Sequence, residues 1–220
     1  MFIAIIPAYN EEKTIGSVIR NLLNLVDRVV VVDDGSLDQT AAAARVAGAT
    51  VLSHKLNRGQ GAAIETGHEY ARIVGADFVI HFDGDGQFCV DDVGPALAAL
   101  RESGADMLFG SRFLGNKSRL PFFKKHILLP LARSFQNFFV GVKLTDAHNG
   151  FRILTARALA KIRLVQDRMA HATEIVEAVK AHRLKYIEFP VRVVYRKYGQ
   201  GFSEGMLVLR DLLLGKFIKK

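Results

Sequence analysis

Cysteine is nearly absent from the sequence, and so are long apolar runs. The 220 residues contain a single cysteine, Cys89, which has no second cysteine in the chain to pair with. An intramolecular disulfide is thereby excluded, and a reducing compartment is expected. No apolar run approaches the roughly 18–20 residues that span a bilayer. The apolar start at residues 2–9 is not preceded by a basic segment, so we expect neither a signal peptide nor a membrane-spanning helix.

Acidic residues are missing from one long stretch. Between Met107 and Thr145 there is no Asp or Glu, and the basic residues there supply nearly all of the formal net charge of +8: Arg112, Lys117, Arg119, Lys124, Lys125, Arg133 and Lys143. Charge gathered in one segment indicates a local anionic partner. Phenylalanine and leucine are interleaved with these charges over residues 112–143, which favours an interfacial segment on an anionic membrane surface.

Two other interpretations of this basic segment were weighed. Its apolar residues can instead belong to the core, with the charges forming a solvated face. Nucleic acid is a competing anion, but the segment is rich in aliphatic residues and the sequence contains no nucleic-acid-binding motif. We therefore expect a membrane surface and no nucleic acid as the partner.

Short apolar runs alternate with helical patterns through the first half of the chain. Buried strands are predicted at residues 2–6, 28–32, 51–54, 78–82 and 106–110, and an alanine-rich helix is predicted near 37–47. This alternation predicts an α/β fold with a mostly parallel central sheet and helices on both faces. The second half predicts, in chain order, a helix at 171–182, a strand at 185–194 and a basic amphipathic helix at 205–220. The length suits one domain.

Acidic residues follow the predicted strand at 78–82. Ligands bind outside the carboxyl ends of parallel strands, so chemistry is expected here. Asp83 and Asp85 can hold one Mg²⁺ or Mn²⁺ ion when substrate phosphates complete its coordination. The alternative is that Asp-Gly-Asp-Gly is merely a turn. Its place after a buried strand, together with a second acidic strand end at Asp33 and Asp34, favours the metal site.

The end of the first strand allows two interpretations. Asn10 has the position of a helix cap, with Glu11 and Glu12 favourably placed in the first helical turn. Alternatively, Tyr9 and Glu11 contact a base and a ribose, and Pro7 shapes the loop. The residues alone favour the cap.

Two further loops are candidates for nucleotide contacts. Asp33 and Asp34 are either turn residues or acceptors of hydrogen bonds from ribose hydroxyls and the base. The loop around Arg58 and Gly59 opens a helix, and it can place an arginine and backbone N–H groups near a phosphate.

Five motifs occur in an order and spacing similar to those of family 2 glycosyltransferases with the GT-A fold: Pro7-Ala8-Tyr9-Asn10-Glu11, Asp33-Asp34-Gly35-Ser36, Asn57–Gly61, Asp83-x-Asp85-x-Gln87 and Gly110-Ser111-Arg112. Over nearly its whole length the chain most resembles the polyprenyl-phosphate mannose and glucose synthases, which are dolichol-phosphate mannosyltransferase-like. The resemblance implies a set of roles: nucleotide contacts at Pro7, Tyr9, Glu11 and Asp33, metal ligands at Asp83, Asp85 and Gln87, and a phosphate contact at Arg112.

The segment from Asp146 to Arg152 resembles the acceptor-side Asp-x-x-(Ser/Asn)-Gly-Phe-Arg segment of that family. The family implies Asp146 as the candidate base for a hydroxyl acceptor, because an alcohol gains about 10²–10⁴-fold from a positioned carboxylate. A phosphate acceptor is largely ionised already, so Asp146 then orients other residues. Arg112 and Arg133 are candidates for holding a lipid phosphate.

A glycine-rich loop at residues 195–203 resembles the flexible loop that closes over the diphosphate in this family, and it implies a diphosphate contact at Arg196. The family commonly has Gly-x-Ser-Lys, whereas this chain has Glu204 in the place of the lysine. The alternative is an ordinary surface loop.

The resemblance therefore implies an inverting, metal-dependent transferase. It would move mannose or glucose from a GDP- or UDP-sugar to a polyprenyl phosphate, dolichyl or undecaprenyl, as a peripheral protein on the cytoplasmic membrane face. Residues 1–110 would bind the nucleotide sugar and 111–204 the acceptor. One alternative is a family 2 enzyme with a glycan or other hydroxyl acceptor. Another is a non-catalytic nucleotide-sugar-binding protein. A nucleotidyltransferase is disfavoured, because no glycine-rich basic loop follows the first strand.

Overall fold

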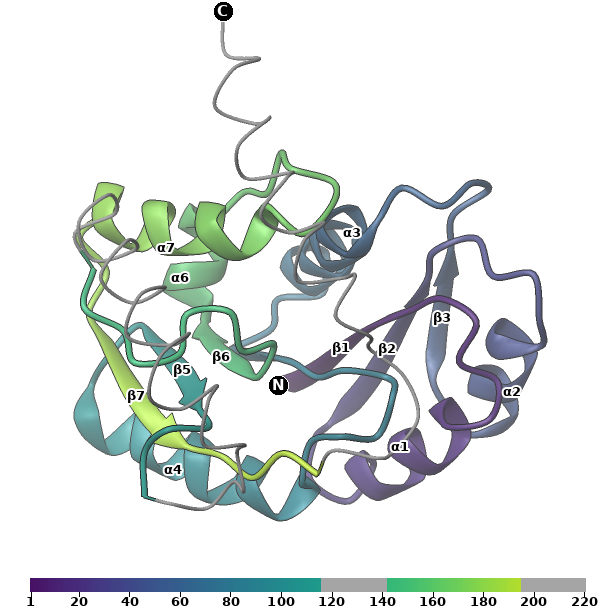
Figure 1. Ribbon diagram of the computed structural model, residues 1–220, viewed down its shortest axis with the longest axis horizontal. Helices are drawn as coiled ribbons and strands as arrows, with labels where there is room; N and C mark the ends of the chain where they lie inside the picture. The colour runs from purple at the N-terminus through teal and green to yellow at the C-terminus, as the bar shows by residue number, and fades with distance from the viewer. Residues whose placement is uncertain (116–141, 195–220) are drawn as a thin grey trace, which may run out of the picture.

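The computed structural model describes residues 1–115 and 142–194. Its strands form one seven-stranded sheet in the order β3-β2-β1-β4-β6-β5-β7 (Figure 1). The strands are β1 (Phe2–Ala8), β2 (Arg28–Asp33), β3 (Thr50–Ser53), β4 (Phe78–His81), β5 (Met107–Ser111), β6 (Arg152–Thr155) and β7 (Tyr186–Pro190). Only β6 runs antiparallel to its neighbours. The predicted α/β fold with a mostly parallel sheet is confirmed.

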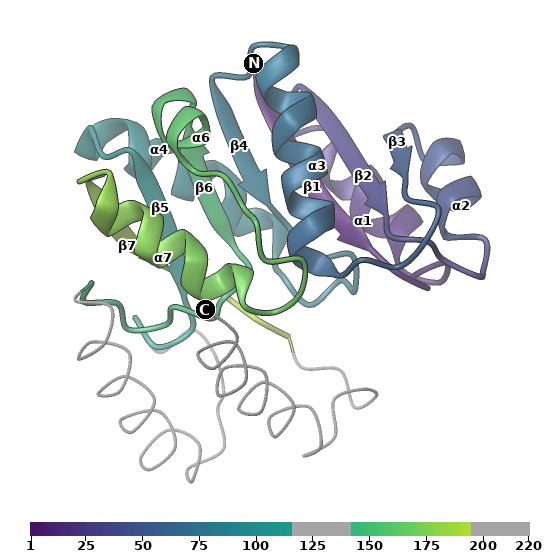
Figure 2. The ribbon, with the colours of Figure 1, turned by 90° about the horizontal axis from the view of Figure 1, so that it is seen from above.

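Helices cover both faces of the sheet, as Figure 2 shows. One face is packed by α1 (Ile15–Leu22), α2 (Thr40–Val46) and α4 (Val93–Ser103), which the 3₁₀ turn η1 (Val90–Asp92) precedes. The other face is packed by α3 (Gln60–Ile73), α6 (Ala156–Lys161) and α7 (His171–Ala181). Among the described residues, none of these helices is both long and apolar enough to cross a membrane.

Strand β1 shows why the sheet is buried on both sides. Ala4 and Ile6 belong to the core on the α1 face, whereas Ile3 and Ile5 belong to the core on the α3 face. Successive side chains of a strand point to opposite faces, so a continuous apolar run fills two cores at once. Helix α3 lies so close to β1 that a Cβ at Gly67 would stand 2.4 Å from Ile5 Cγ2.

Strand β6 places the second half of the chain in the middle of the sheet. It lies between β4 and β5, where Arg152 pairs with His81 on one side and with Phe109 on the other. The segment that leads into β6 therefore arrives beside the carboxyl end of β4. This topology brings residues 146–152 next to Asp83.

Several predicted boundaries moved by a few residues. The helix predicted near 37–47 begins at Thr40, because the preceding residues bond to the loop after β1: Asn10 N–H donates to Ser36 Oγ, Leu37 N–H to Asn10 Oδ1 and Gln39 N–H to Glu12 Oε2. The strand predicted at 185–194 ends at Pro190. Nearly all of the basic segment 112–143 and the predicted helix at 205–220 lie outside the described residues.

Candidate active site

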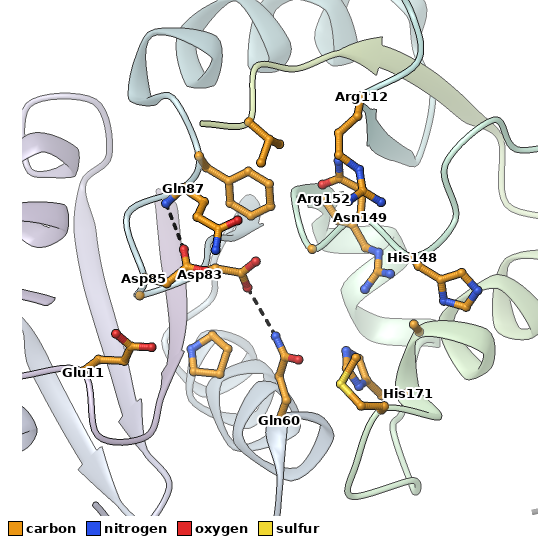
Figure 3. Close-up of a pocket in the computed structure, with 17 residues that line it drawn as sticks. Glu11, Gln60, Asp83, Asp85, Gln87, Arg112, His148, Asn149, Arg152 and His171 are labelled. Carbon is orange, nitrogen blue, oxygen red and sulfur yellow. Dashed lines mark hydrogen bonds between the residues drawn. The ribbon is translucent and has the colours of Figure 1, made fainter. Parts of the chain in front are cut away.

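The carboxyl ends of β1 and β4 open onto a pocket of about 340 Å³ (Figure 3). Residues predicted for donor and metal binding line it: Pro7, Glu11, Asp83, Asp85, Gln87 and Arg112. Acidic and amide groups lie on the side of β1 and β4, and the arginines Arg112 and Arg152 lie on the opposite side with His148 and His171. The pocket is thus acidic on one side and basic on the other.

Asp83 lies two residues beyond β4, and its carboxyl packs against Gly150. A Cβ at Gly150 would meet Asp83 Oδ2 at 2.7 Å, so a glycine is needed for this contact. Gln60 Nε2 donates a hydrogen bond to Asp83 Oδ1 at 3.3 Å. Protein surrounds the carboxyl although part of it stays open to the pocket. This burial, with the charge of Asp85 added, raises the pKa of Asp83 to about 7.

Asp85 and Glu11 complete the acidic side. The Asp85 Oδ1 atom accepts a hydrogen bond from the Gln87 N–H at 2.9 Å, which fixes the loop after β4. Burial raises the pKa of Glu11, and the charge of Asp85 adds to this effect. Burial and neighbouring negative charge both disfavour the ionised form of these carboxyls, and a bound cation would favour it.

The acidic side fits a hard divalent cation. Asp83, Asp85 and Gln87 offer the oxygen donors that Mg²⁺ and Mn²⁺ prefer. Within residues 1–115 and 142–194, however, no group of three or more His, Cys, Asp and Glu side chains is arranged to hold a metal ion. A cation here would therefore need substrate phosphates to complete its coordination. The three ligands remain a prediction.

Arg112 and Asp146 form an ion pair on the basic side, in which Asp146 is buried and Arg112 is partly exposed. Arg112 Nε donates to Asp146 Oδ2 and Nη2 to Oδ1, each at 2.7 Å, and the Arg112 backbone N–H donates to Oδ2 at 3.0 Å. Asn149 Nδ2 donates a fourth hydrogen bond to the Asp146 carboxylate, at 3.3 Å from Oδ2. Asp146 is itself buried and is not among the residues that line the pocket. Its carboxylate is engaged in orienting Arg112.

Arg152 is the most deeply buried charged group of the pocket. Only 1% of its surface is exposed, yet it lines the pocket, and its guanidinium lies among Asp83, His148 and His171 in Figure 3. Its Nη2 donates to the Ala147 carbonyl at 3.0 Å, and its Nε has no hydrogen-bond partner among the residues that the structure describes. Burial lowers the pKa of Arg152 to about 10, so the group stays protonated at neutral pH.

The loop after β1 is arranged differently from the favoured interpretation of Asn10. Helix α1 has Thr14, not Asn10, at its N-cap position, so the predicted helix cap is wrong. Asn10 has φ of 57° and tethers this loop to Ser36 and Leu37 instead. Tyr9 is 44% exposed and does not line the pocket. Its contact with a base stays a prediction.

Asp33 and Asp34 are both buried, and neither lines the pocket. Asp33 Oδ1 accepts the Ser36 N–H at 3.2 Å, as a turn residue does. The Asp34 carboxylate accepts the backbone N–H groups of Arg58 at 3.0 Å and Gly59 at 2.6 Å, so it holds the loop that precedes α3. Within the structure both residues organise loops, and their contacts with a ribose remain predictions.

The Arg58 side chain is exposed and pairs with Asp167 at 3.1 Å, away from the pocket. Arg133 and Arg196, predicted to contact phosphates, lie outside the described residues. No sequence pattern assigned an individual role to Arg152, Gln60 or His171. Arg152 stood within a recognised motif, but nothing in the sequence marked it as a buried charge.

Comparison with known proteins agrees with this geometry. The model of the family described as Glycosyl transferase family 2 matches residues 3–163. An uncharacterised protein of Methanocaldococcus jannaschii is 34% identical, over 96% of this chain and 90% of that protein. The UDP-N-acetylglucosamine–dolichyl-phosphate N-acetylglucosaminyltransferase of Methanococcus voltae is 30% identical, over 93% of this chain and 90% of that protein.

Among solved structures, the fold is similar to glucosyl-3-phosphoglycerate synthase from Mycobacterium tuberculosis in complex with Mn²⁺, uridine diphosphate and glucosyl-3-phosphoglycerate. The TM-score is 0.71 at 20% identity, covering 97% of this chain and 77% of that one. The likeness concerns the fold, which is of the predicted GT-A type.

Proposed function

We propose that this chain, which belongs to glycosyl transferase family 2, transfers a sugar from a nucleotide-sugar donor to a polyprenyl phosphate. The observation that carries the proposal is the division of one pocket into an acidic and a basic side. An acidic side suits a cation with the diphosphate of a donor, and a basic side suits a second anion. A transferase whose acceptor is a phosphate needs both.

On the donor side, Asp83, Asp85 and Gln87 would hold Mg²⁺ or Mn²⁺ against the diphosphate. When bound, such a cation neutralises the charge that develops on the departing nucleoside diphosphate. Pro7 and Glu11 line the same side of the pocket and would contact the nucleotide. Arg196 would add a second positive group to the diphosphate.

On the acceptor side, the engagement of Asp146 favours a phosphate over an alcohol. Its two oxygens accept hydrogen bonds from Nε and Nη2 of the Arg112 guanidinium (the Arg112 fork), from the Arg112 backbone N–H and from Asn149. They are therefore poorly placed to remove a proton. A hydroxyl acceptor needs such a base, whereas a phosphate with a second pKa near 6 is already an ionised nucleophile at neutral pH.

The reaction then needs no proton transfer to the protein. An acceptor phosphate oxygen forms a bond to the anomeric carbon of the sugar, and the bond between that carbon and the diphosphate oxygen breaks with its electron pair. Attack from the face opposite to the leaving group inverts the anomeric configuration. The products are a sugar-phosphate lipid and a free nucleoside diphosphate.

The acceptor lipid implies work at a membrane. We propose that the basic segment 112–143 and the C-terminal segment 205–220 hold the protein peripherally on the cytoplasmic face. The sequence supports this proposal through the acid-free run of Lys and Arg with interleaved Phe and Leu.

A radiolabelled donor panel tests the proposal. The panel contains GDP-mannose, UDP-glucose and, because of the Methanococcus voltae relative, UDP-N-acetylglucosamine. Each donor is incubated with Mg²⁺ or Mn²⁺ and a short polyprenyl phosphate or the matching polyprenol, and the mixture is extracted with solvent. We expect label in the organic phase with the phosphate and not with the alcohol. Label transferred only to the alcohol, or to neither lipid, would refute the phosphate acceptor.

A further inference from the structure

Arg152 is a buried charge without a carboxylate of its own. It lies in the middle of the sheet with 1% of its surface exposed, and its Nε has no hydrogen-bond partner in residues 1–115 or 142–194. Among the described residues it forms no ion pair, and its one hydrogen bond goes to the Ala147 carbonyl. A buried charge is costly unless an opposite charge compensates it, so this position calls for an anion.

Two carboxylates, Asp83 and Asp146, exert their charge on Arg152, but each has another partner. Asp146 is engaged by the Arg112 fork, which means that the charge of Arg112 is compensated as well. Asp83 is assigned to the cation in the proposed function. Of the two pocket arginines, Arg152 is therefore the one that forms no ion pair with any residue that the structure describes.

The first turn of α7 faces the same part of the pocket. His171 and Ala172 line it, and the N-cap residue Ala170 supplies no side-chain cap. The amino end of a helix carries a partial positive charge that favours an anion. His171 Nδ1 lies 2.7 Å from the Arg168 carbonyl, so Nδ1 carries the proton that this contact requires. The neutral ring therefore has no N–H left for the pocket, and Arg152 remains the donor.

We propose that Arg152, and not Arg112, binds the phosphate of the acceptor. This inference rests on the proposed function, since it names the residue that makes that site select a phosphate over an alcohol. A phosphoryl group at Arg152 has two possible sources, the acceptor phosphate and the donor diphosphate. We commit to the acceptor, because Arg152 lies across the pocket from Glu11 and Asp85, where the donor is expected (Figure 3).

Binding measurements on an Arg152→Met variant test the inference without relying on turnover. Methionine has a similar length and no charge, and replacing a buried charge by an apolar side chain of similar volume is often tolerated. Calorimetry would measure farnesyl phosphate, farnesol, and UDP and GDP with Mn²⁺. The matched control is Arg157→Met, because Arg157 is exposed on α6 and pairs with Asp106 outside the pocket.

We expect Arg152→Met to weaken farnesyl phosphate binding about 10- to 100-fold, the loss of a charge-assisted contact. Farnesol and nucleotide binding should stay as in the unmutated protein, and Arg157→Met should change none of the three. Equal losses for farnesyl phosphate and farnesol would mean a structural role. Weaker UDP or GDP binding with unchanged farnesyl phosphate binding would assign Arg152 to the donor. Either result, or no change at all, overturns the proposal.

A crystal structure of the unmutated protein with farnesyl phosphate decides the matter if the variant does not fold. Phosphate oxygens within hydrogen-bond distance of the Arg152 guanidinium would support the assignment. A phosphate on Arg112, elsewhere, or not bound at all would overturn it. These results are separate from the donor panel: transfer to a polyprenyl phosphate that does not involve Arg152 refutes this inference and leaves the proposed function standing.

Discussion

Asp85 gives the most direct test of the acidic side of the pocket at the scale of single residues. We expect Asp85→Ala to weaken Mn²⁺-dependent binding of UDP or GDP about 100-fold, because one of two carboxylates facing the cation is lost. Calorimetry with and without Mn²⁺ measures this.

Asp91→Ala serves as the control for Asp85→Ala. Asp91 is a nearby exposed acid that pairs with Arg192 and does not line the pocket, so its removal should leave nucleotide binding unchanged. Chelation of the metal should reproduce the Asp85→Ala result in the unmutated protein. A nucleotide affinity that is unchanged in Asp85→Ala and unchanged by the chelator would contradict a cation at this site.

Gly150 tests whether the shape of the site matters as well as its charge. An added Cβ would press on both Asp83 oxygens, at 2.7 and 3.0 Å. We therefore expect Gly150→Ala to lower Mn²⁺-dependent nucleotide affinity by roughly tenfold, as displaced metal-site geometry does. Gly94→Ala is the matched control, because its Cβ would meet nothing within 4 Å. Equal nucleotide affinity in the two variants would show that nucleotide binding does not depend on the position of the Asp83 carboxylate.

Asp146 separates the phosphate acceptor from a hydroxyl acceptor. Asp146→Asn breaks one half of the Arg112 fork and should lower the free energy of unfolding by about 1–3 kcal/mol. With a phosphate acceptor, turnover at a temperature where the variant is folded should fall less than about 100-fold, and donor affinity should stay the same. A loss toward about 10⁴-fold at unchanged donor affinity would identify Asp146 as a base and favour the alcohol.

At the scale of elements, the contact between α3 and β1 positions the start of α3, where Gln60 lines the pocket. Gly67 allows the close approach, since a Cβ there would stand 2.4 Å from Ile5 Cγ2 and 3.1 Å from Ile5 Cδ1. We expect Gly67→Ala to cost about 1–3 kcal/mol of unfolding free energy through overpacking.

Urea unfolding of Gly67→Ala and Gly94→Ala provides the comparison. Gly94 lies in α4 with open space around its Cα, so alanine there should stabilise the protein by about 0.5–1 kcal/mol through helix propensity. A stabilised Gly67→Ala variant would mean that α3 can move away from β1 without lowering the free energy of unfolding.

The elements that local patterns predicted best are the strands of the first half, of which β1, β2, β4 and β5 are buried over nearly all of their residues and β3 is only partly buried. The five predicted strands of the first half all occur, because a continuous apolar run in a strand fills both faces of a sheet. The start of α2 was predicted less well, since residues 36–39 bond to residues 10–12 across the sheet edge. The antiparallel course of β6 could not be predicted, because a short strand carries no local sign of its direction.

At the scale of the whole molecule, buried neutral histidines predict a pH-dependent stability. Burial lowers the pKa of His171 to about 4, from an unfolded value of about 6.5. Below about pH 6.5 the unfolded chain therefore binds a proton that the folded chain does not bind. The unfolding free energy that comes from the neutral His171 is complete above about pH 6.5 and is lost as the pH falls toward about 4.

Comparison with His171→Asn isolates this effect from other titrating groups. Asparagine keeps a donor for the Arg168 carbonyl but does not titrate. Between about pH 7 and pH 5, the unmutated protein should lose up to about 2 kcal/mol more unfolding free energy than the variant. Urea unfolding at the two pH values measures the difference, and parallel pH curves would contradict a buried neutral His171. The raised pKa of Asp83 acts in the opposite direction in both proteins, so it cancels in this comparison.

The sequence by itself determined the parts of this protein that depend on local pattern. Apolar periodicity predicted the α/β layers. The strand ends and the family resemblance together marked Pro7, Glu11, Asp83, Asp85 and Gln87, which line one pocket, whereas Asp33 and Asp34, marked in the same way, do not line it. Parallel strands place their carboxyl ends at one edge of the sheet, so residues far apart in the chain can be assigned to one site from pattern alone.

Only the tertiary structure decided which charges are compensated. Asp146 is engaged by Arg112, Asp34 holds the loop of Arg58 and Gly59, and Arg152 is buried and forms no ion pair within the described part of the chain. Each of these facts depends on a contact between segments distant in the chain. The sequence shows that a residue is charged, but it does not show whether that charge is solvated, paired or available to a ligand. These states differ only in the surroundings of the side chain.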